Sequence, residues 1–174
     1  MNNKKVAVFG TSRARPGEPI YEMASEVGAV LADMGCTVVN GGYGGVMLAS
    51  AKAAFEKGAQ TIGVTCEAFG RAGPNRYISK EISTENLDQR LQKLIEMADA
   101  YVILPGGTGT LLELATVWEL ENKGFVNLRK PIILLGDFWK PLLHIIASDD
   151  TDSGRCLELV EDAGGIAKVL EKYD

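Results

Sequence analysis

Short apolar runs alternate along the chain with longer stretches of helical periodicity. In one such stretch, apolar residues recur at three- and four-residue spacing, which predicts an amphipathic helix over 19–34. The same pattern predicts helices over 45–57, 86–97, 109–122 and 139–147, and a last helix that begins at Asp162 or Gly165 and runs through Leu170. The apolar runs predict strands over 6–9, 37–39, 61–64, 77–82, 101–104, 131–135 and 157–160.

Strands separated by segments of helix length indicate βαβ units and a mainly parallel sheet. The strand runs are continuous in Val, Ile and Leu, which is typical of strands covered on both faces. We therefore predict a single α/β domain over 1–174, with a Rossmann-like, doubly wound, mainly parallel sheet and helices on both faces. Ligands of such sheets lie beyond the carboxyl ends of the strands, so the loops after each strand are the places to search.

Composition narrows the classes of function. The 174 residues are 46% hydrophobic and 24% charged, which is ordinary for a globular protein, and the net charge of −5 argues against a nucleic-acid partner. The three cysteines form no CxxC pair, so neither a disulfide framework nor a zinc site is expected, and a cytoplasmic location is favoured. No segment approaches the roughly 18 apolar residues of a membrane span, so we expect no membrane partner.

Two stretches with arginines are candidates for the rim of a substrate site. The polar loop 10–17 follows the first strand and includes Ser12 and Arg13. Arg71 and Arg76 make the stretch after the third strand locally basic in an acidic chain. Solvated loops, or a subunit contact in the second case, explain these residues equally well, so both interpretations stay open.

The second strand ends at a glycine-rich junction, NGGYGG over 40–45. Four glycines let a ligand approach the backbone closely, and the free N–H groups of the next helix would face that ligand. A tight turn alone rarely needs so many glycines. The sequence therefore predicts phosphate-binding residues here, namely Gly41, Gly42, Gly44 and Gly45.

The segment PGGTGTLLE over 105–113 follows the fifth strand and opens a helix. Glycines leave backbone N–H groups bare, threonines add hydroxyl donors, and a helix N-terminus carries about half a positive charge. These features predict a phosphate cradle made of Gly106, Gly107, Thr108, Gly109 and Thr110. Glu113 lies one turn into the helix, where it either reaches the sugar of a nucleotide or acts as a capping carboxylate.

Familiar phosphate motifs do not match. The dinucleotide fingerprint GxGxxG fails because Met47 and Leu112 stand where a third glycine belongs. The second strand ends at Asn40, with no acidic residue for a ribose diol, so NAD is disfavoured. The P-loop pattern fails because no Lys-Ser/Thr follows either glycine run.

Three segments together resemble a known family. PGGTGTLLE matches the pattern PGGxGTxxE, NGGYGGVM is similar to a GGGxxGLM element, and Arg90 in NLDQRLQKL stands where that family carries its motif arginine. The chain resembles the LONELY GUY (LOG) family of cytokinin riboside 5′-monophosphate phosphoribohydrolases, formerly labelled lysine decarboxylase-like. From its helix alone, Arg90 would be interpreted as a surface charge; the resemblance makes it a site residue.

The resemblance implies a Rossmann-like fold, a homodimer, and no metal or organic cofactor. It also implies cleavage of the N-glycosidic bond of a nucleoside 5′-monophosphate, either AMP or a cytokinin riboside monophosphate. The products would be ribose 5-phosphate and free adenine or a cytokinin-like base. In this hypothesis Arg90 and Glu113 are the catalytic residues, and the glycine loops fix the 5′-phosphate.

The sequence also departs from the family pattern at three positions. Asp88 and Leu91 flank Arg90 where the family has histidine and lysine, and Leu112 replaces the first of two paired glutamates. The alternative is therefore a non-catalytic protein of the same fold that binds a nucleotide or another phosphate ligand.

Overall fold

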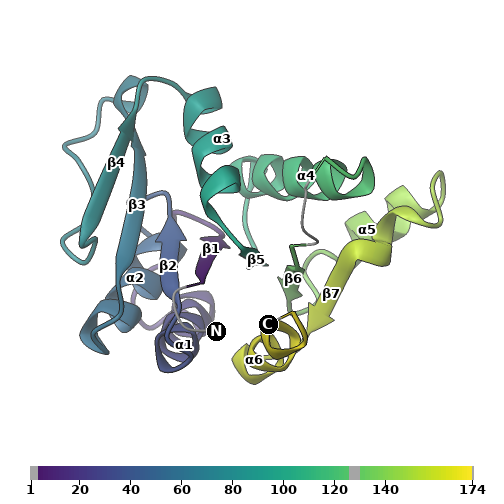
Figure 1. Cartoon of the computed structure of the whole chain (residues 1–174), viewed down its shortest axis with the longest axis horizontal. Helices are drawn as coiled ribbons and strands as arrows, with labels where there is room; N and C mark the ends of the chain where they lie inside the picture. Colours follow the sequence, from purple (N-terminus) through teal and green to yellow (C-terminus); the bar gives the residue numbers. More distant parts are fainter. Residues whose placement is uncertain (1–3, 126–129, 174) are drawn as a thin grey trace.

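The computed structural model describes residues 4–125 and 130–173, so short parts of the predicted domain 1–174 lie outside the described residues. Its strands pair in parallel throughout and form one seven-stranded sheet in the order β4-β3-β2-β1-β5-β6-β7 (Figure 1). The strands are β1 (Lys5–Phe9), β2 (Thr37–Asn40), β3 (Thr61–Cys66), β4 (Lys80–Thr84), β5 (Ala100–Ile103), β6 (Ile132–Leu135) and β7 (Leu157–Val160).

Helices cover both faces of this sheet. Figure 1 shows α1, α2 and α6 on one face and α3, α4 and α5 on the other, which confirms the predicted doubly wound α/β class. The helices are α1 (Pro19–Asp33), α2 (Val46–Glu56), α3 (Leu87–Met97), α4 (Thr108–Asn122), α5 (Lys140–Ala147) and α6 (Ala163–Lys172), with short 3-10 helices η1 (Glu67–Phe69) and η2 (Ser153–Cys156).

The core consists of two apolar layers separated by the sheet. Side chains alternate across a strand, so Val6 and Val8 of β1 pack in the layer beneath α1, α2 and α6. Ala7 and Phe9 of the same strand pack in the other layer, beside α3 and α4. Burial on both faces explains why the strand sequences are continuously apolar.

Side-chain capping fixes where two of the helices, α3 and α6, begin. The side chain of Asn86 accepts a hydrogen bond from the N–H of Gln89 at 2.9 Å and starts α3. Asp162 accepts one from Gly165 N at 2.9 Å, so the last helix begins at Ala163. The earlier of the two predicted starts is therefore the better one.

The fourth strand differs from the prediction. The sequence predicted a strand over 77–82, whereas β4 spans Lys80–Thr84. Asn75 holds the preceding segment in a turn, because its side chain donates to Gly42 O at 3.1 Å and to Tyr43 O at 2.9 Å. Its Oδ1 also accepts from Tyr77 N at 3.0 Å. These contacts take the apolar start of the predicted strand out of the sheet.

The strand order creates a crevice at one end of the sheet. The chain builds outward from β1 to β4 and then returns to place β5 on the other side of β1. The loops after β1 and β5 therefore diverge toward opposite faces, which is the usual position of a ligand site in such sheets. Within 4–125 and 130–173, no helix is long and apolar enough to cross a membrane.

Candidate active site

A cleft of about 630 Å³ opens at the carboxyl ends of β1, β2 and β5. Its walls come from the loops after these strands, from the segment around η1, and from α3 and α4. The predicted site residues that line it are Ser12, Arg13, Gly41, Arg71, Arg90, Gly107, Thr108, Gly109, Thr110 and Glu113. Those that the structure places outside its lining are Gly42, Gly44, Gly45, Gly106 and Arg76.

The N-terminus of α4 forms one wall. Gly107 is the N-cap residue, and no side chain caps this helix end. A Cβ added at Gly107 or Gly109 would meet no atom within 4 Å, so both backbones face open space. Gly106 has a different role, because a Cβ there would overlap the buried side chain of Thr110. This wall therefore presents the first, uncapped N–H groups of a helix to the cleft.

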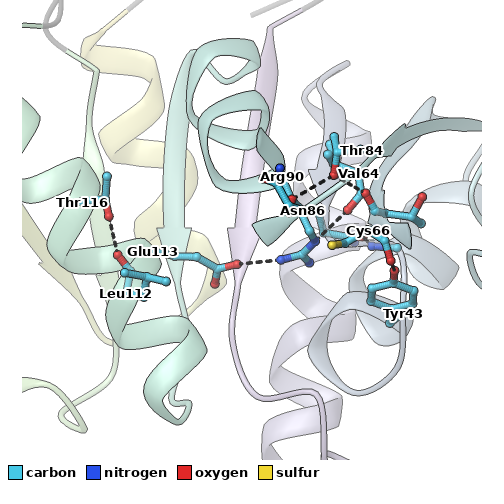
Figure 2. A network of polar contacts seen from close by, with 12 residues as sticks. Tyr43, Val64, Cys66, Thr84, Asn86, Arg90, Leu112, Glu113 and Thr116 are labelled. Atoms are coloured by element: carbon cyan, nitrogen blue, oxygen red, sulfur yellow. Dashed lines mark hydrogen bonds and ion pairs between the residues drawn. The ribbon is translucent and has the colours of Figure 1, made fainter. Parts of the chain in front are cut away.

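Glu113 projects from α4 toward α3, as Figure 2 shows. Its Oε1 lies 3.8 Å from Nη1 of Arg90, and only 14% of its side chain is exposed. The first turn of α4 holds no acidic residue, so Glu113 is not a capping carboxylate. Burial raises the pKa of Glu113 to about 7, although the positive charge of Arg90 acts in the opposite direction. A carboxyl group with such a pKa can exchange a proton near neutral pH.

Arg90 is only 7% exposed, so its interpretation as a surface charge is wrong. Its Nε donates a hydrogen bond to the carbonyl oxygen of Val64 at 2.9 Å, which ties α3 to the end of β3 (Figure 2). The guanidinium carbon lies 5.8 Å from the ring centre of Tyr43 and 5.6 Å from that of Phe69. Buried arginine is uncommon unless it is paired, and here Glu113 is the charged partner.

The two aromatic rings are site residues that sequence reasoning missed. The hydroxyl of Tyr43 accepts from Cys66 N at 2.9 Å and donates to Cys66 O at 3.3 Å, which holds the ring in place. Phe69 remains 42% exposed, and the Arg71 guanidinium lies 4.6 Å from the Tyr43 ring centre. An aromatic residue inside a glycine loop is a signal in the sequence, but its position beside Arg90 depends on the fold.

The loop after β2 is held by its own hydrogen bonds. Asn40 is fully buried; its Oδ1 accepts from Gly42 N at 2.8 Å and its Nδ2 donates to Met47 O at 2.9 Å. The N–H of Val46 donates to Thr11 O at 2.9 Å. Gly42 and Gly45 have φ angles of 77° and 65°, which favour glycine. Several glycines of this loop thus serve its packing.

Arg76 lies outside the cleft. Its guanidinium stacks 4.8 Å from the ring centre of Tyr77 and donates to the tyrosine hydroxyl at 2.7 Å. Among the described residues, no group of three or more His, Cys, Asp or Glu side chains is placed to hold a metal ion.

Comparison with known proteins settles the family. A family model described as "possible lysine decarboxylase" matches residues 47–165. A cytokinin riboside 5′-monophosphate phosphoribohydrolase of Mycobacterium marinum is 34% identical over 137 residues, which cover 77% of this chain and 71% of the relative. The chain belongs to the LOG family.

Solved structures share the fold of this LOG family member. The structure named TM1055, a structural genomics target, is 25% identical with a TM-score of 0.76, and the match covers 97% of this chain and 99% of that one. A molybdenum cofactor binding protein from Rippkaea orientalis is 20% identical with a TM-score of 0.78, covering 98% and 96%. The second likeness shows the fold alone.

The older family description does not suit the cleft. A lysine decarboxylase would hold pyridoxal phosphate on a lysine through a Schiff base. No lysine is among the described residues that line the cleft. The charged side chains there are Arg13, Arg71, Arg90 and Glu113. This set suits an anionic ligand with one ionisable carboxyl group beside it.

Proposed function

We propose that this LOG family member hydrolyses the N-glycosidic bond of a nucleoside 5′-monophosphate, releasing a free base and ribose 5-phosphate. The observation that carries the proposal is the buried pair of Arg90 and Glu113, 3.8 Å apart, beside the uncapped N-terminus of α4. The names of the relatives support the reaction type. Adenine and cytokinin-like bases are the proposed leaving groups.

The features that line the cleft can be assigned to the three groups of such a substrate. The 5′-phosphate would lie at Gly107–Thr110, because bare N–H groups at a helix N-terminus bind anions. Glu113 comes about one turn later on α4, where the ribose would lie. The base would lie at Arg90 and the rings of Tyr43 and Phe69, which also line the cleft.

Hydrolysis places a hydroxyl group on C1′ and a proton on the departing base. Positive charge develops on the ribose ring as the C1′–N bond breaks, as in other glycoside hydrolyses. Ionised Glu113 would offset that charge and accept a proton from the attacking water. Arg90 would hold the departing base, and its charge favours the ionised form of Glu113.

An assay with matched variants tests this proposal. Purified protein is incubated with AMP and with an N6-prenylated AMP, and the base and ribose 5-phosphate are quantified by chromatography. Glu113→Gln should lower kcat by about 10²- to 10⁴-fold, the usual contribution of a general acid or base. Glu119→Gln is the control, because this glutamate is exposed on the same helix and pairs with Lys123. No product from any nucleoside monophosphate would refute the hydrolase.

The alternative is a non-catalytic binding protein for a nucleotide or another phosphate ligand. Leu112 favours it, because this side chain lines the cleft and is 41% exposed where the family has a glutamate. Thermal denaturation with added AMP separates the two functions, since a ligand that binds the native state raises its stability. A raised melting temperature with no released base would support the binding protein.

We also propose a homodimer. Large apolar side chains are exposed on and beside α4 and α5, including Phe125 at 74%, Ile145 at 67% and Phe138 at 54%. We infer that these side chains form the contact surface, because contiguous exposed apolar patches mark sites of protein–protein contact. Sedimentation equilibrium would measure the mass in solution, and a monomer at all concentrations would refute the dimer.

A further inference from the structure

Gly41, the first residue after β2, lies against the tip of Arg90. A Cβ added at Gly41 would overlap Nη2 of Arg90 and would lie 2.9 Å from its Cζ. It would also lie 2.7 Å from Sδ of Met47. The φ angle of Gly41 is outside the left-handed region, so backbone conformation does not require glycine here. What requires glycine is space.

Contacts hold the guanidinium of Arg90 on several sides, and only the cleft that it lines is open. Its Nε is bonded to Val64 O at 2.9 Å, and its Nη1 lies 3.8 Å from Glu113. The rings of Tyr43 and Phe69 lie within 6 Å of Cζ. A side chain at Gly41 would therefore displace the guanidinium toward the cleft, at the expense of its bond to Val64 or its contact with Glu113.

We propose that Gly41 is a positioning residue: the space left by its missing side chain is the seat that holds the Arg90 guanidinium beside Glu113. This assigns the first glycine of the β2 loop to the Arg90–Glu113 pair, in addition to any contact with a phosphate. The link to catalysis rests on the proposed hydrolase, whereas the seat itself does not.

The seat has a consequence for Glu113. The charge of Arg90 opposes the effect of burial on the pKa of Glu113. The other charged side chains that line the cleft are Arg13, from the loop after β1, and Arg71, from the segment after η1, and both are exposed. Moving Arg90 away should therefore leave Glu113 protonated over a wider range of pH.

The test compares Gly41→Ala with Gly154→Ala. Gly154 is exposed, has no positive φ, and a Cβ there would meet nothing within 4 Å, so its substitution controls for the added methyl group. The titration of Glu113 is followed in each protein by carbon-13 NMR of labelled glutamate, with Glu113→Gln identifying the signal. Gly41→Ala should raise the pKa of Glu113 above that of the wild type, and Gly154→Ala should leave it unchanged.

Activity gives a second readout. Gly41→Ala should lower kcat by about 10- to 100-fold, as expected for a displaced catalytic group, with a much smaller change in KM. The acidic limb of its pH profile should move to higher pH. If the wild type hydrolyses no nucleotide but Gly41→Ala still raises the pKa of Glu113, the proposed hydrolase is refuted and the seat is supported. An unchanged titration in an active Gly41→Ala protein would overturn the seat.

A double-mutant cycle with Arg90→Lys shows whether the contact is direct. Lysine ends in a single ammonium and lacks Nη2, the atom that a Cβ at position 41 would overlap. Gly41→Ala should therefore cost much less stability in the Arg90→Lys background than in the wild type. The cycle also covers the case in which Gly41→Ala alone does not fold. Folding rescued by Arg90→Lys supports the seat, and equal losses in both backgrounds overturn it.

Discussion

The loops after β2 and β5 look alike in sequence, because each places several glycines between a buried strand and a helix. In the structure they differ. After β2, a Cβ at Gly41 would overlap Arg90, and a Cβ at Gly45 would overlap Thr11 O. After β5, Gly107 and Gly109 face open space. Glycines at a strand–helix junction can thus permit either close packing or access for a ligand, and their number does not show which.

The backbone of Thr11 connects the two loops. Its N–H donates to Pro105 O at 3.1 Å, and its carbonyl accepts from Val46 N at 2.9 Å. The loop after β1 therefore holds the β2 loop and the β5 loop at a fixed distance from each other. We call the β2 loop the packed side of the cleft, because it supports Arg90. The β5 loop and the start of α4 are the open side, which holds the proposed phosphate site and Glu113.

The difference between the two loops is tested most strongly by replacing one glycine of each with alanine. Gly45→Ala should lower the free energy of unfolding by about 3 kcal/mol or more, because a positive φ costs about 1–3 kcal/mol and the methyl group overlaps a carbonyl. Gly109→Ala should leave stability unchanged or raise it by up to about 1 kcal/mol, since alanine favours the helix. Urea denaturation measures both, and equal losses would remove the distinction between the loops.

Glu113, on the open side of the cleft, should also make the stability of the protein depend on pH. The unfolded chain loses the Glu113 proton near pH 4.5, whereas the folded protein keeps it up to about pH 7. The contribution of Glu113 is therefore full below about pH 4.5 and is lost as the pH rises through 7.

Wild-type protein should lose up to about 3 kcal/mol relative to Glu113→Gln between these limits, because one pKa unit corresponds to about 1.4 kcal/mol. Unfolding free energies at pH 4.5 and near pH 8 measure this loss. Glu119→Gln, which alters an exposed residue of the same helix, should track the wild type. A pH-independent difference between wild type and Glu113→Gln would mean that Glu113 titrates normally.

Phe69, whose ring packs beside Tyr43 of the β2 loop, should contribute to recognition of the base. Phe69→Ala should weaken binding of AMP about tenfold, because stacking of a base on an aromatic ring contributes about 1–3 kcal/mol. It should leave binding of ribose 5-phosphate unchanged. Phe55→Ala is a matched control, since Phe55 is 44% exposed against 42% for Phe69 and does not line the cleft. Calorimetry that finds equal effects of the two variants on AMP would place the base elsewhere.

Much of the fold was predictable from local periodicity. The predicted α/β class and the existence of its strands and helices are confirmed, since the period of the apolar residues follows the face that each element buries. The exception at β4 has a specific cause. Asn75 bonds to the β2 loop, 32 and 33 residues earlier in the chain, and holds the segment before β4 in a turn. No local pattern carries that information.

The candidate site was predictable in part. PGGTGTLLE could be identified from the sequence as a candidate phosphate site, because such a site needs glycines and a helix N-terminus in one continuous segment. Arg90 was identified only through the family resemblance, because its helix looks amphipathic. Tyr43 and Phe69 were missed, since they come together from the β2 loop and η1.

The sequence by itself determined the alternation of strands and helices and the position of the open glycine loop before α4, because both follow from neighbours in the chain. Only the tertiary structure decided that Arg90 and Glu113, on different helices, are buried as a pair. Desolvation and the charge of a distant residue set the pKa of Glu113, and both depend on which segments pack together. The same packing sets Gly41 apart from the other loop glycines, because Arg90 occupies the space that a side chain at Gly41 would fill.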